Sequence, residues 1–463
     1  MSVGESLARR VFFPLHERLR GRRTLGEMRA LVELAAQPAK HVERVCDARL
    51  RALLTFAAAR LPFYERRFAD AGVNPQATDP DAELARLPVL TKHVVRASAA
   101  EMTWPEVPGG LQPTVSGGTS GDTLHFHVDR VRQAQSMGAR LFMQQLFGVR
   151  PGDRRMWLWG SPIELKPSRL RRVRDRLINE LVLDAFDLAA ARADAYLHRI
   201  AAYRPRLLIG YTSAVTLLAE RALRTRDPRA FASLRAVVMT GDEVLPEQRA
   251  AVRAAFGCPA VSEYGSREVG LIAHDCPHGR MHVLTPHVRV EITREERRLP
   301  AGQCGRITCT NLNSRAQPLI RYDLGDVGVL NPAGCDCGLP FPVLEITGGR
   351  LTGFVVLPSG ELRHGHLVAY LARAEPAVVE FKVYQRSLDA LDVQIVANDQ
   401  YTPAVLERIR RSFRTHFGAA VRVNCTRVDH IPPDPSGKRR HFVSQIAPQY
   451  ERGLAAAFEQ QTR

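Results

Sequence analysis

The chain has 463 residues, 45% of them hydrophobic, and carries a formal net charge of +17. Its length and composition favour a folded protein of two or more domains with a sizeable core. Eight cysteines in a chain of this size exclude a secreted disulfide scaffold, and no apolar run is long enough for a signal peptide core or a membrane span. We therefore expect a cytoplasmic protein without a transmembrane segment.

Arginine supplies nearly all of the positive charge, because lysine is rare. Such a charge can indicate a nucleic-acid or membrane partner. Here the arginines are scattered among alanines, and their field would also favour acidic nucleotide substrates. We therefore expect small-molecule partners and no nucleic acid. Arginines also surround Val11, Phe12 and Phe13, and we expect these three side chains to pack on the protein body rather than touch a membrane.

Residues 1 to about 95 are predicted to be helical. Apolar residues recur there at near-helical spacing, as at Val42, Val45, Leu50 and Leu53. We expect this segment to form a packing layer on the rest of the chain.

Between residues 96 and 347, short β-branched runs alternate with amphipathic helical stretches. Such βαβ alternation predicts a largely parallel sheet covered by helices, with ligands at the carboxyl ends of the strands. The clearest series consists of strands and helices at 207–209, 214–223, 236–239, 246–256 and 261–264.

The last third of the chain changes character. Strands at 288–292 and 306–310 have a hairpin-like pattern and predict an added β subdomain. After a glycine pair at 348–349, two strands, a helix near 402–417 and a further strand predict a compact α+β unit. The predicted fold class is therefore α/β, with a large N-terminal domain of residues 1–347 and a small C-terminal domain of residues 348–463.

Glycines and hydroxyl residues are concentrated after residue 115. Glycine lets backbone amides approach an anion closely, and the hydroxyl groups donate further hydrogen bonds to phosphate oxygens. The segment has neither the Walker pattern nor a dinucleotide fingerprint, and a surface turn is the alternative. Its residues are Ser116, Gly117, Gly118, Thr119, Ser120 and Gly121.

Three further motifs follow in chain order: YGSRE at 264–268, RYDLGD at 321–326 and SGK at 436–438. With the glycine-rich segment, they resemble the adenylate-forming superfamily, in particular its phenylacetate-CoA ligase branch and the capsule-biosynthesis-type relatives. The resemblance covers most of the chain, and the YGSRE and RYDLGD pair is its most specific part. It implies that ATP activates a carboxylic acid to an acyl adenylate, with release of pyrophosphate, and that the C-terminal domain is mobile.

The resemblance also implies the residues of an ATP and AMP site. The glycine-rich segment would hold the β- and γ-phosphates, Tyr264 would lie beside the adenine, and Asp326 would accept both ribose hydroxyls. A carboxylate suits that last task because each of its oxygens can accept a hydrogen bond. The other implied nucleotide contacts are Gly241, Asp242, Glu243, Glu263, Gly265 and Arg350.

Glu268 and Lys438 are the catalytic residues that the resemblance implies. Glu268 would bind Mg²⁺, which prefers oxygen ligands. Lys438 would bridge the carboxylate and the α-phosphate when the small domain closes, as an ammonium on a long stem can. Asp122 and Gly353 depart from the family pattern, which often has lysine in the phosphate loop and an acid at the hinge. These departures motivate an alternative, a nucleotide-binding regulatory protein without turnover.

Four cysteine and histidine residues form a candidate metal site. Three thiolates and one imidazole fit a tetrahedral structural Zn²⁺, and His274 or His278 could replace the histidine of the set. Reduced thiols without a metal are the alternative, because the CxC spacing is shorter than that of common zinc fingers. The candidate ligands are Cys276, His282, Cys335 and Cys337.

The acid and its acceptor are less defined. CoA is the acceptor that the resemblance implies, and transfer to an amine or another non-CoA acceptor is the closest alternative. No single residue identifies the acid, and the oligomeric state stays open. Related enzymes build the walls of the acyl pocket near Trp159, Tyr211, Thr212 and Ser213.

Overall fold

The computed structural model describes residues 3–116, 124–159, 169–185, 190–225, 228–348, 354–359, 362–364, 368, 371–372, 374–432 and 441–446. Residues 3–97 are mainly helical, as predicted. They form α1 (Val3–Leu7), a π-helical segment (Ala8–Phe12), α2 (Phe13–Leu19), α3 (Thr24–Ala35), α4 (Ala39–Arg60), α5 (Pro62–Asp70), α6 (Pro80–Arg86) and α7 (Lys92–Ala97).

The apolar stripe of this helical layer faces the core. In α4, Val42, Leu50 and Leu53 are buried at helical spacing. Asp79 and Thr91 accept hydrogen bonds from backbone amides at the starts of α6 and α7, so each of these short helices has a side-chain cap. None of the helices in the described residues is both long enough and apolar enough to cross a bilayer.

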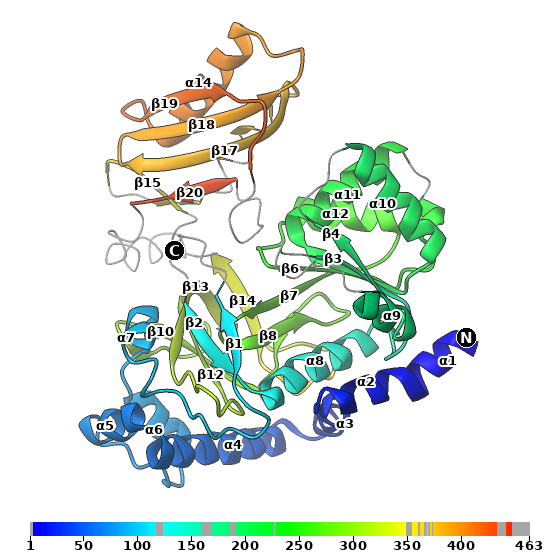
Figure 1. Ribbon diagram of the computed structural model, residues 1–463. Coiled ribbons are helices and arrows are strands. Elements are labelled where there is room, and N and C mark those ends of the chain that lie inside the picture. Colours follow the sequence, from blue (N-terminus) through cyan, green and yellow to red (C-terminus); the bar gives the residue numbers. More distant parts are fainter. Residues whose placement is uncertain are drawn as a thin grey trace.

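A twelve-stranded mixed sheet lies at the centre of the large part of the molecule (Figure 1). Its strands run in the order β11-β10-β12-β13-β14-β9-β8-β7-β6-β5-β3-β4. The parallel half consists of β3 (Arg155–Trp159), β4 (Glu180–Asp184), β5 (Leu207–Tyr211), β6 (Ala236–Thr240) and β7 (Ala260–Ser266).

The helices predicted between these strands are present. Figure 1 shows α10 (Ala190–Tyr203), α11 (Thr212–Thr225) and α12 (Pro246–Phe256) grouped beside the parallel strands, with α8 (Arg130–Gln145) and α9 (Arg169–Leu177) elsewhere along the sheet. A short 3-10 helix covers Pro228–Phe231. The helix that the sequence placed at 246–256 has these same bounds, because Pro246 begins it and Gly257, at φ +64°, ends it.

The other half of the sheet is antiparallel. It consists of β8 (Gly270–Asp275), β9 (Met281–Val283), β10 (Val288–Arg294), β11 (Arg297–Arg298), β12 (Gly305–Asn311), β13 (Tyr322–Asn331) and β14 (Val343–Gly348). The strands predicted at 288–292 and 306–310 pair as expected, within β10 and β12. A separate hairpin joins β1 (Gln112–Val115) to β2 (His125–Val128).

The C-terminal part forms an α+β unit with its own core. Its sheet has the order β19-β18-β17-β20, built from β17 (Val378–Ser387), β18 (Ala390–Ala397), β19 (Arg422–Arg427) and β20 (Phe442–Ser444). Helix α14 (Pro403–Phe417) buries Val405, Ile409, Phe413 and Phe417. A small ribbon of β15 (Phe354–Val356) and β16 (Leu362–His364) adds Val355 to the same core. The boundary predicted near residues 348–350 lies at the edge of the described residues.

Candidate active site

Aromatic residues meet at the carboxyl ends of the parallel strands. Trp159 ends β3 and Tyr211 ends β5, and their rings stack with centroids 4.5 Å apart and an interplanar angle of 22°. Tyr211 lies opposite Thr240 of β6, which lies opposite Glu263 of β7. In open α/β sheets this edge is where ligands bind. Two of the predicted pocket residues therefore stand at the expected edge.

The loop after β6 is fixed to the start of α11. The hydroxyl of Thr212 donates to the carbonyl of Asp242 at 3.1 Å and to that of Thr240 at 3.4 Å. Gly241 lies between them at φ +90°, a conformation that favours glycine. Asp242 and Glu243, like Ser213, are partly exposed. These predicted residues are thus held together beside Tyr211.

The two most specific motifs meet through their side chains. The hydroxyl of Tyr264, in β7, donates to Oδ2 of Asp326, in β13, at 2.7 Å. Three strands separate β7 from β13, so a flat sheet would place them about 19 Å apart at the usual strand spacing. The sheet must therefore curl strongly between β7 and β13, and this curl brings the two motifs together.

Glu268 lies in the turn between β7 and β8 and is partly exposed. The buried guanidinium of Arg132, from α8, braces this turn by donating to the carbonyls of Arg267 and Val269. Burial lowers the pKa of Arg132 to about 10, against the opposing effect of the carboxylates of Asp129 and Glu268. Glu268 is thus presented to solvent by a turn with a buried cationic support.

The same turn is tied to the base of the glycine-rich segment. Arg267 donates to the carbonyl of Val115 at 3.1 Å. Next to Val115, the amide of Ser116 donates to the carbonyl of Leu124, and the Ser116 hydroxyl accepts from the Leu124 amide, both at 2.8 Å. The ends of the segment are therefore closed together beside the turn of Glu268.

Several predicted residues lie outside the described residues. They include most of the phosphate loop, the hinge arginine and the catalytic lysine, together with both departures from the family pattern. These residues are Gly117, Gly118, Thr119, Ser120, Gly121, Asp122, Arg350, Gly353 and Lys438.

Glu263 has a different environment from its neighbour Tyr264. Its carboxylate is buried and forms a bidentate ion pair with Arg140 of α8, with both N–O distances at 2.6 Å. Burial opposes ionisation, but the Arg140 cation holds the pKa of Glu263 below its ordinary value. The guanidinium also lies over the Trp157 ring, 5.7 Å from its centroid. The carboxylate that the sequence assigned to nucleotide binding is therefore engaged in a buried pair.

Sequence reasoning missed Arg140 and Arg132. Arg132 is buried on α8, and Arg140, whose side chain is 19% exposed, is next to buried Leu141. Charged residues are rarely buried unless they are paired, so an arginine within an apolar helix face was the available signal. The abundance of arginine in the chain obscured it.

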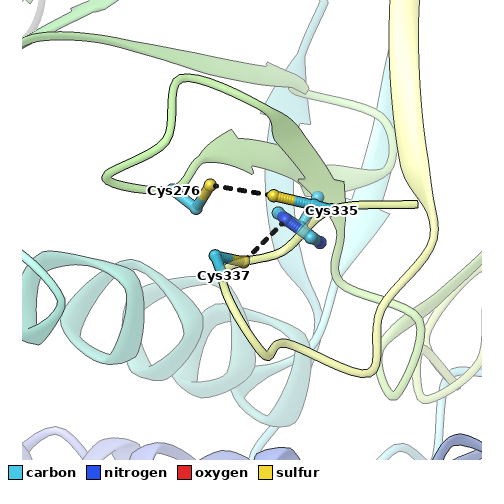
Figure 2. A group of neighbouring side chains, drawn as sticks. Cys276, Cys335 and Cys337 are labelled. Carbon is cyan, nitrogen blue, oxygen red and sulfur yellow. Dashed lines mark hydrogen bonds between the residues drawn. The ribbon is translucent and has the colours of Figure 1, made fainter. Parts of the chain in front are cut away.

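The predicted metal ligands form a cluster (Figure 2). Cys276 follows β8, His282 lies in β9, and Cys335 and Cys337 lie between β13 and β14; their ligand atoms are all within 4.8 Å of one another. The sulfurs of Cys276 and Cys335 are 3.8 Å apart, and Cys337 Sγ is 3.2 Å from His282 Nε2. Tetrahedral zinc with Zn–S bonds of about 2.3 Å separates two sulfurs by about 3.8 Å. The donor set and its spacing fit Zn²⁺.

The surroundings of His282 also suit a metal ligand. Its Nδ1 lies 2.8 Å from the carbonyl oxygen of Phe341, which orients the ring and leaves Nε2 directed at the thiols. His274, the alternative ligand considered from the sequence, instead bonds through Nδ1 to the carbonyl of Asp275 and lies beside Phe147. His282 is therefore the histidine of the cluster.

This fold, a curled mixed sheet with a separate α+β unit, is shared with a solved acyl-CoA ligase. The structure of 2-hydroxyisobutyryl-CoA ligase in the postadenylation state, in complex with 2-HIB-AMP, matches it with a TM-score of 0.69 and 20% sequence identity. The match covers 92% of this chain and 93% of that one.

Two curated relatives belong to the branch that the motifs resemble. Protein CapK of Staphylococcus aureus is 21% identical over 371 residues, which are 79% of this chain and 81% of CapK. Phenylacetate-coenzyme A ligase of Thermus thermophilus is 21% identical over 452 residues, covering 89% of this chain and 98% of the relative. Residues 359–445 match the CapK C-terminal domain family. The resemblance to the phenylacetate-CoA ligase and CapK branch is thereby confirmed.

Proposed function

We propose that the protein is an AMP-forming acid–CoA ligase. A carboxylate oxygen of the acid attacks the α-phosphorus of ATP, and pyrophosphate leaves. The thiolate of CoA then attacks the carbonyl carbon of the acyl adenylate, and AMP leaves. The observation that carries the proposal is the hydrogen bond between Tyr264 and Asp326, because it joins the two family motifs at the ligand-binding edge of the sheet.

The residues on this edge have distinct roles in the proposal. The Tyr264 ring flanks the adenine, and the Asp326 carboxylate accepts from the ribose. The loop at 241–243 covers the other face of the base. Glu263 supports β7 through its ion pair with Arg140. Trp159 and Tyr211 form part of the wall of the acyl pocket.

The phosphates of ATP would be bound between the glycine-rich segment and Glu268. The bonds from Arg267 to Val115 and from Ser116 to Leu124 support this assignment, because they hold the two elements side by side. Glu268 would hold Mg²⁺, whose charge offsets that of the phosphates during attack. Arg132 fixes the turn on which Glu268 lies.

The reaction would require movement between two domains, residues 1–347 and 348–463. The separate core of the C-terminal unit and the family match over 359–445 support this division. Lys438 would enter the site when the small domain closes and would neutralise charge between the carboxylate and the α-phosphate, with Arg350 near the hinge.

We further infer that Cys276, His282, Cys335 and Cys337 bind a structural Zn²⁺. Four protein ligands would fill the coordination shell and leave no position for substrate. The metal would connect the β8–β9 turn to the loop between β13 and β14. It would therefore stabilise the antiparallel half of the sheet without taking part in the reaction.

Pyrophosphate release from Mg-ATP tests the enzymatic proposal. The acid panel should include phenylacetate and 2-hydroxyisobutyrate, named by the relatives, together with fatty acids. We expect release with one acid class, a further increase with CoA, and AMP as the second product. Lys438→Ala should reduce release at least about 100-fold, whereas Lys40→Ala, which alters an exposed lysine of α4, should not. Equal rates in the two variants, or ADP as the product, would refute the proposal.

A further inference from the structure

The N-terminal helical segment exposes apolar side chains along one face. Leu7, Val11, Leu15 and Leu19 succeed one another at four-residue intervals and are all exposed, Leu19 to 80%. Residues four apart lie on the same side of a helix, so these four form a stripe. The opposite side carries buried Phe13. The expectation that Phe12 and Phe13 pack on the body is confirmed, because Phe13 is buried and Phe12 packs against the same cluster, but it is wrong for Val11, which is exposed.

A second apolar stripe lies on the neighbouring helix α9. Leu170 is 83% exposed, and Val173 and Leu177 are also exposed, at spacings that share a helix face. Ile178, which follows α9, packs with Phe13 of α2, and Figure 1 shows the two helices close together. Exposed apolar residues gathered on adjacent helices commonly mark a binding surface. We call these two stripes the N-terminal surface.

The exposed charge on this surface is entirely positive. Arg10, Arg18 and Arg20 are exposed around the first stripe, and Arg172 and Arg176 around the second. Within residues 4–19 and 169–177, no acidic side chain is exposed: Glu17 and Asp175 are buried, and Glu5 is half-buried. Glu17 pairs with Arg22, and Asp175 with Arg174. The exposed side chains of these two segments therefore fit a partner that is both apolar and anionic.

We propose that the N-terminal surface binds the surface of an anionic phospholipid bilayer. An amphipathic helix with leucines on one face and arginines beside them lies in the plane of the membrane, with its apolar side chains in the boundary between headgroups and acyl chains. The arginine stems extend along the apolar layer while their guanidinium groups reach the lipid phosphates. A symmetric dimer through the same surface is disfavoured, because it would bring arginines of one sign against each other.

Vesicle co-sedimentation of the full chain tests this proposal. We expect binding to vesicles of mixed phosphatidylcholine and phosphatidylglycerol, weaker binding at high salt, and little binding to phosphatidylcholine alone. Leu15→Gln/Leu19→Gln should weaken binding about tenfold or more, because two apolar groups no longer enter the bilayer. Leu170→Gln provides a second variant, on α9. All of these residues are exposed, so the melting temperature should not change.

A matched charge control distinguishes vesicle binding through the N-terminal surface from binding that results from the net positive charge of the whole chain. Arg10→Gln/Arg18→Gln/Arg20→Gln should weaken binding about 100-fold. Arg44→Gln/Arg60→Gln/Arg411→Gln removes the same charge from exposed positions elsewhere and should change binding no more than about threefold. Equal losses in the two triple variants, absence of binding to the mixed vesicles, or a dimer that Leu15→Gln/Leu19→Gln dissociates would overturn the proposal.

Discussion

At the scale of single residues, the site combines side chains predicted from motifs with others that only the structure reveals. Tyr264 and Asp326 were predicted separately, and the structure brings them into a hydrogen bond. Arg140, Arg132 and the bond from Arg267 to Val115 were not predicted. These arginines act through partners distant in sequence, and local spacing carries no information about such partners. In a chain so rich in arginine, the residue type alone does not indicate which arginines belong to the site.

Asp326 provides the first residue-scale prediction. Asp326→Asn removes a charged acceptor from the ribose site, and a hydrogen bond to a charged group contributes about 1.5–3 kcal/mol. We therefore expect kcat/KM for ATP to fall about 10- to 100-fold in the pyrophosphate assay. Asp399→Asn, at an exposed position of the C-terminal unit, is the matched control. An unchanged kcat/KM for ATP would remove Asp326 from the nucleotide site.

The ion pair of Glu263 and Arg140 provides the second residue-scale prediction. Glu263→Gln leaves the Arg140 cation, which is 19% exposed, without its counter-charge, which costs up to about 3–5 kcal/mol. Denaturant unfolding should show this loss, and Arg140→Met/Glu263→Gln should recover part of it. Glu407→Gln breaks an exposed pair with Arg410 and should cost less than about 1 kcal/mol. Similar losses in the two glutamate variants would contradict a special role for the buried pair.

The same pair predicts how stability depends on pH. The pKa of Glu263 is lower in the folded protein than its ordinary value of 4.5, because Arg140 outweighs the effect of burial. Its contribution to stability is therefore fully present above about pH 4.5 and is lost as the pH falls through the lower folded pKa. In urea titrations between pH 7 and pH 3, Glu263→Gln should lose less stability on acidification than the parent chain.

At the scale of elements, local patterns predicted the parallel half of the sheet well. The strands and helices between 207 and 264 match β5 to β7, because buried β-branched runs and amphipathic stretches leave clear periodicities. The pairing of β10 with β12 was predicted for the same reason. The pairing of β9 with β14, within the antiparallel half, was not predicted. β9 is a three-residue strand that pairs with β14 at Val343 and His282, and the amide of Val283 donates to the carbonyl of Pro342 just before β14.

The cysteine cluster allows a prediction at this scale. Cys337→Ser should abolish stoichiometric zinc in the purified protein, measured by elemental analysis, and lower the melting temperature by several degrees, because metal binding adds to folding free energy. Cys425→Ser, outside the cluster, should leave zinc content unchanged. A parent chain purified in the presence of zinc but lacking the metal would exclude the site.

At the scale of the whole molecule, the two proposed domains have different roles in the reaction. The proposed nucleotide-binding residues of the described part lie before residue 348, whereas Lys438 would belong to the second proposed domain. A fragment of residues 1–347 should therefore bind ATP in calorimetry with an affinity within about tenfold of the full chain, yet release no pyrophosphate. The full-length Lys438→Ala variant is its control. A fragment that catalyses adenylation at the parent rate would refute the assignment of the lysine.

The proposed zinc site lies at the pairing of β9 with β14 and would link metal supply to nucleotide affinity. Val343 and His282 pair β14 with β9, which lie between the strand of Asp326 and the strand of Tyr264, and His282 is itself a proposed zinc ligand. The metal would thus hold together the strands that lie between Tyr264 and Asp326, the residues proposed to bind adenine and ribose. When zinc is scarce, the pairing of β9 with β14 would be less stable. ATP would then bind less tightly, although no proposed zinc ligand is among the residues proposed to contact the substrate. The rate of acid activation in the cell would then follow the availability of a metal that takes no part in the chemistry.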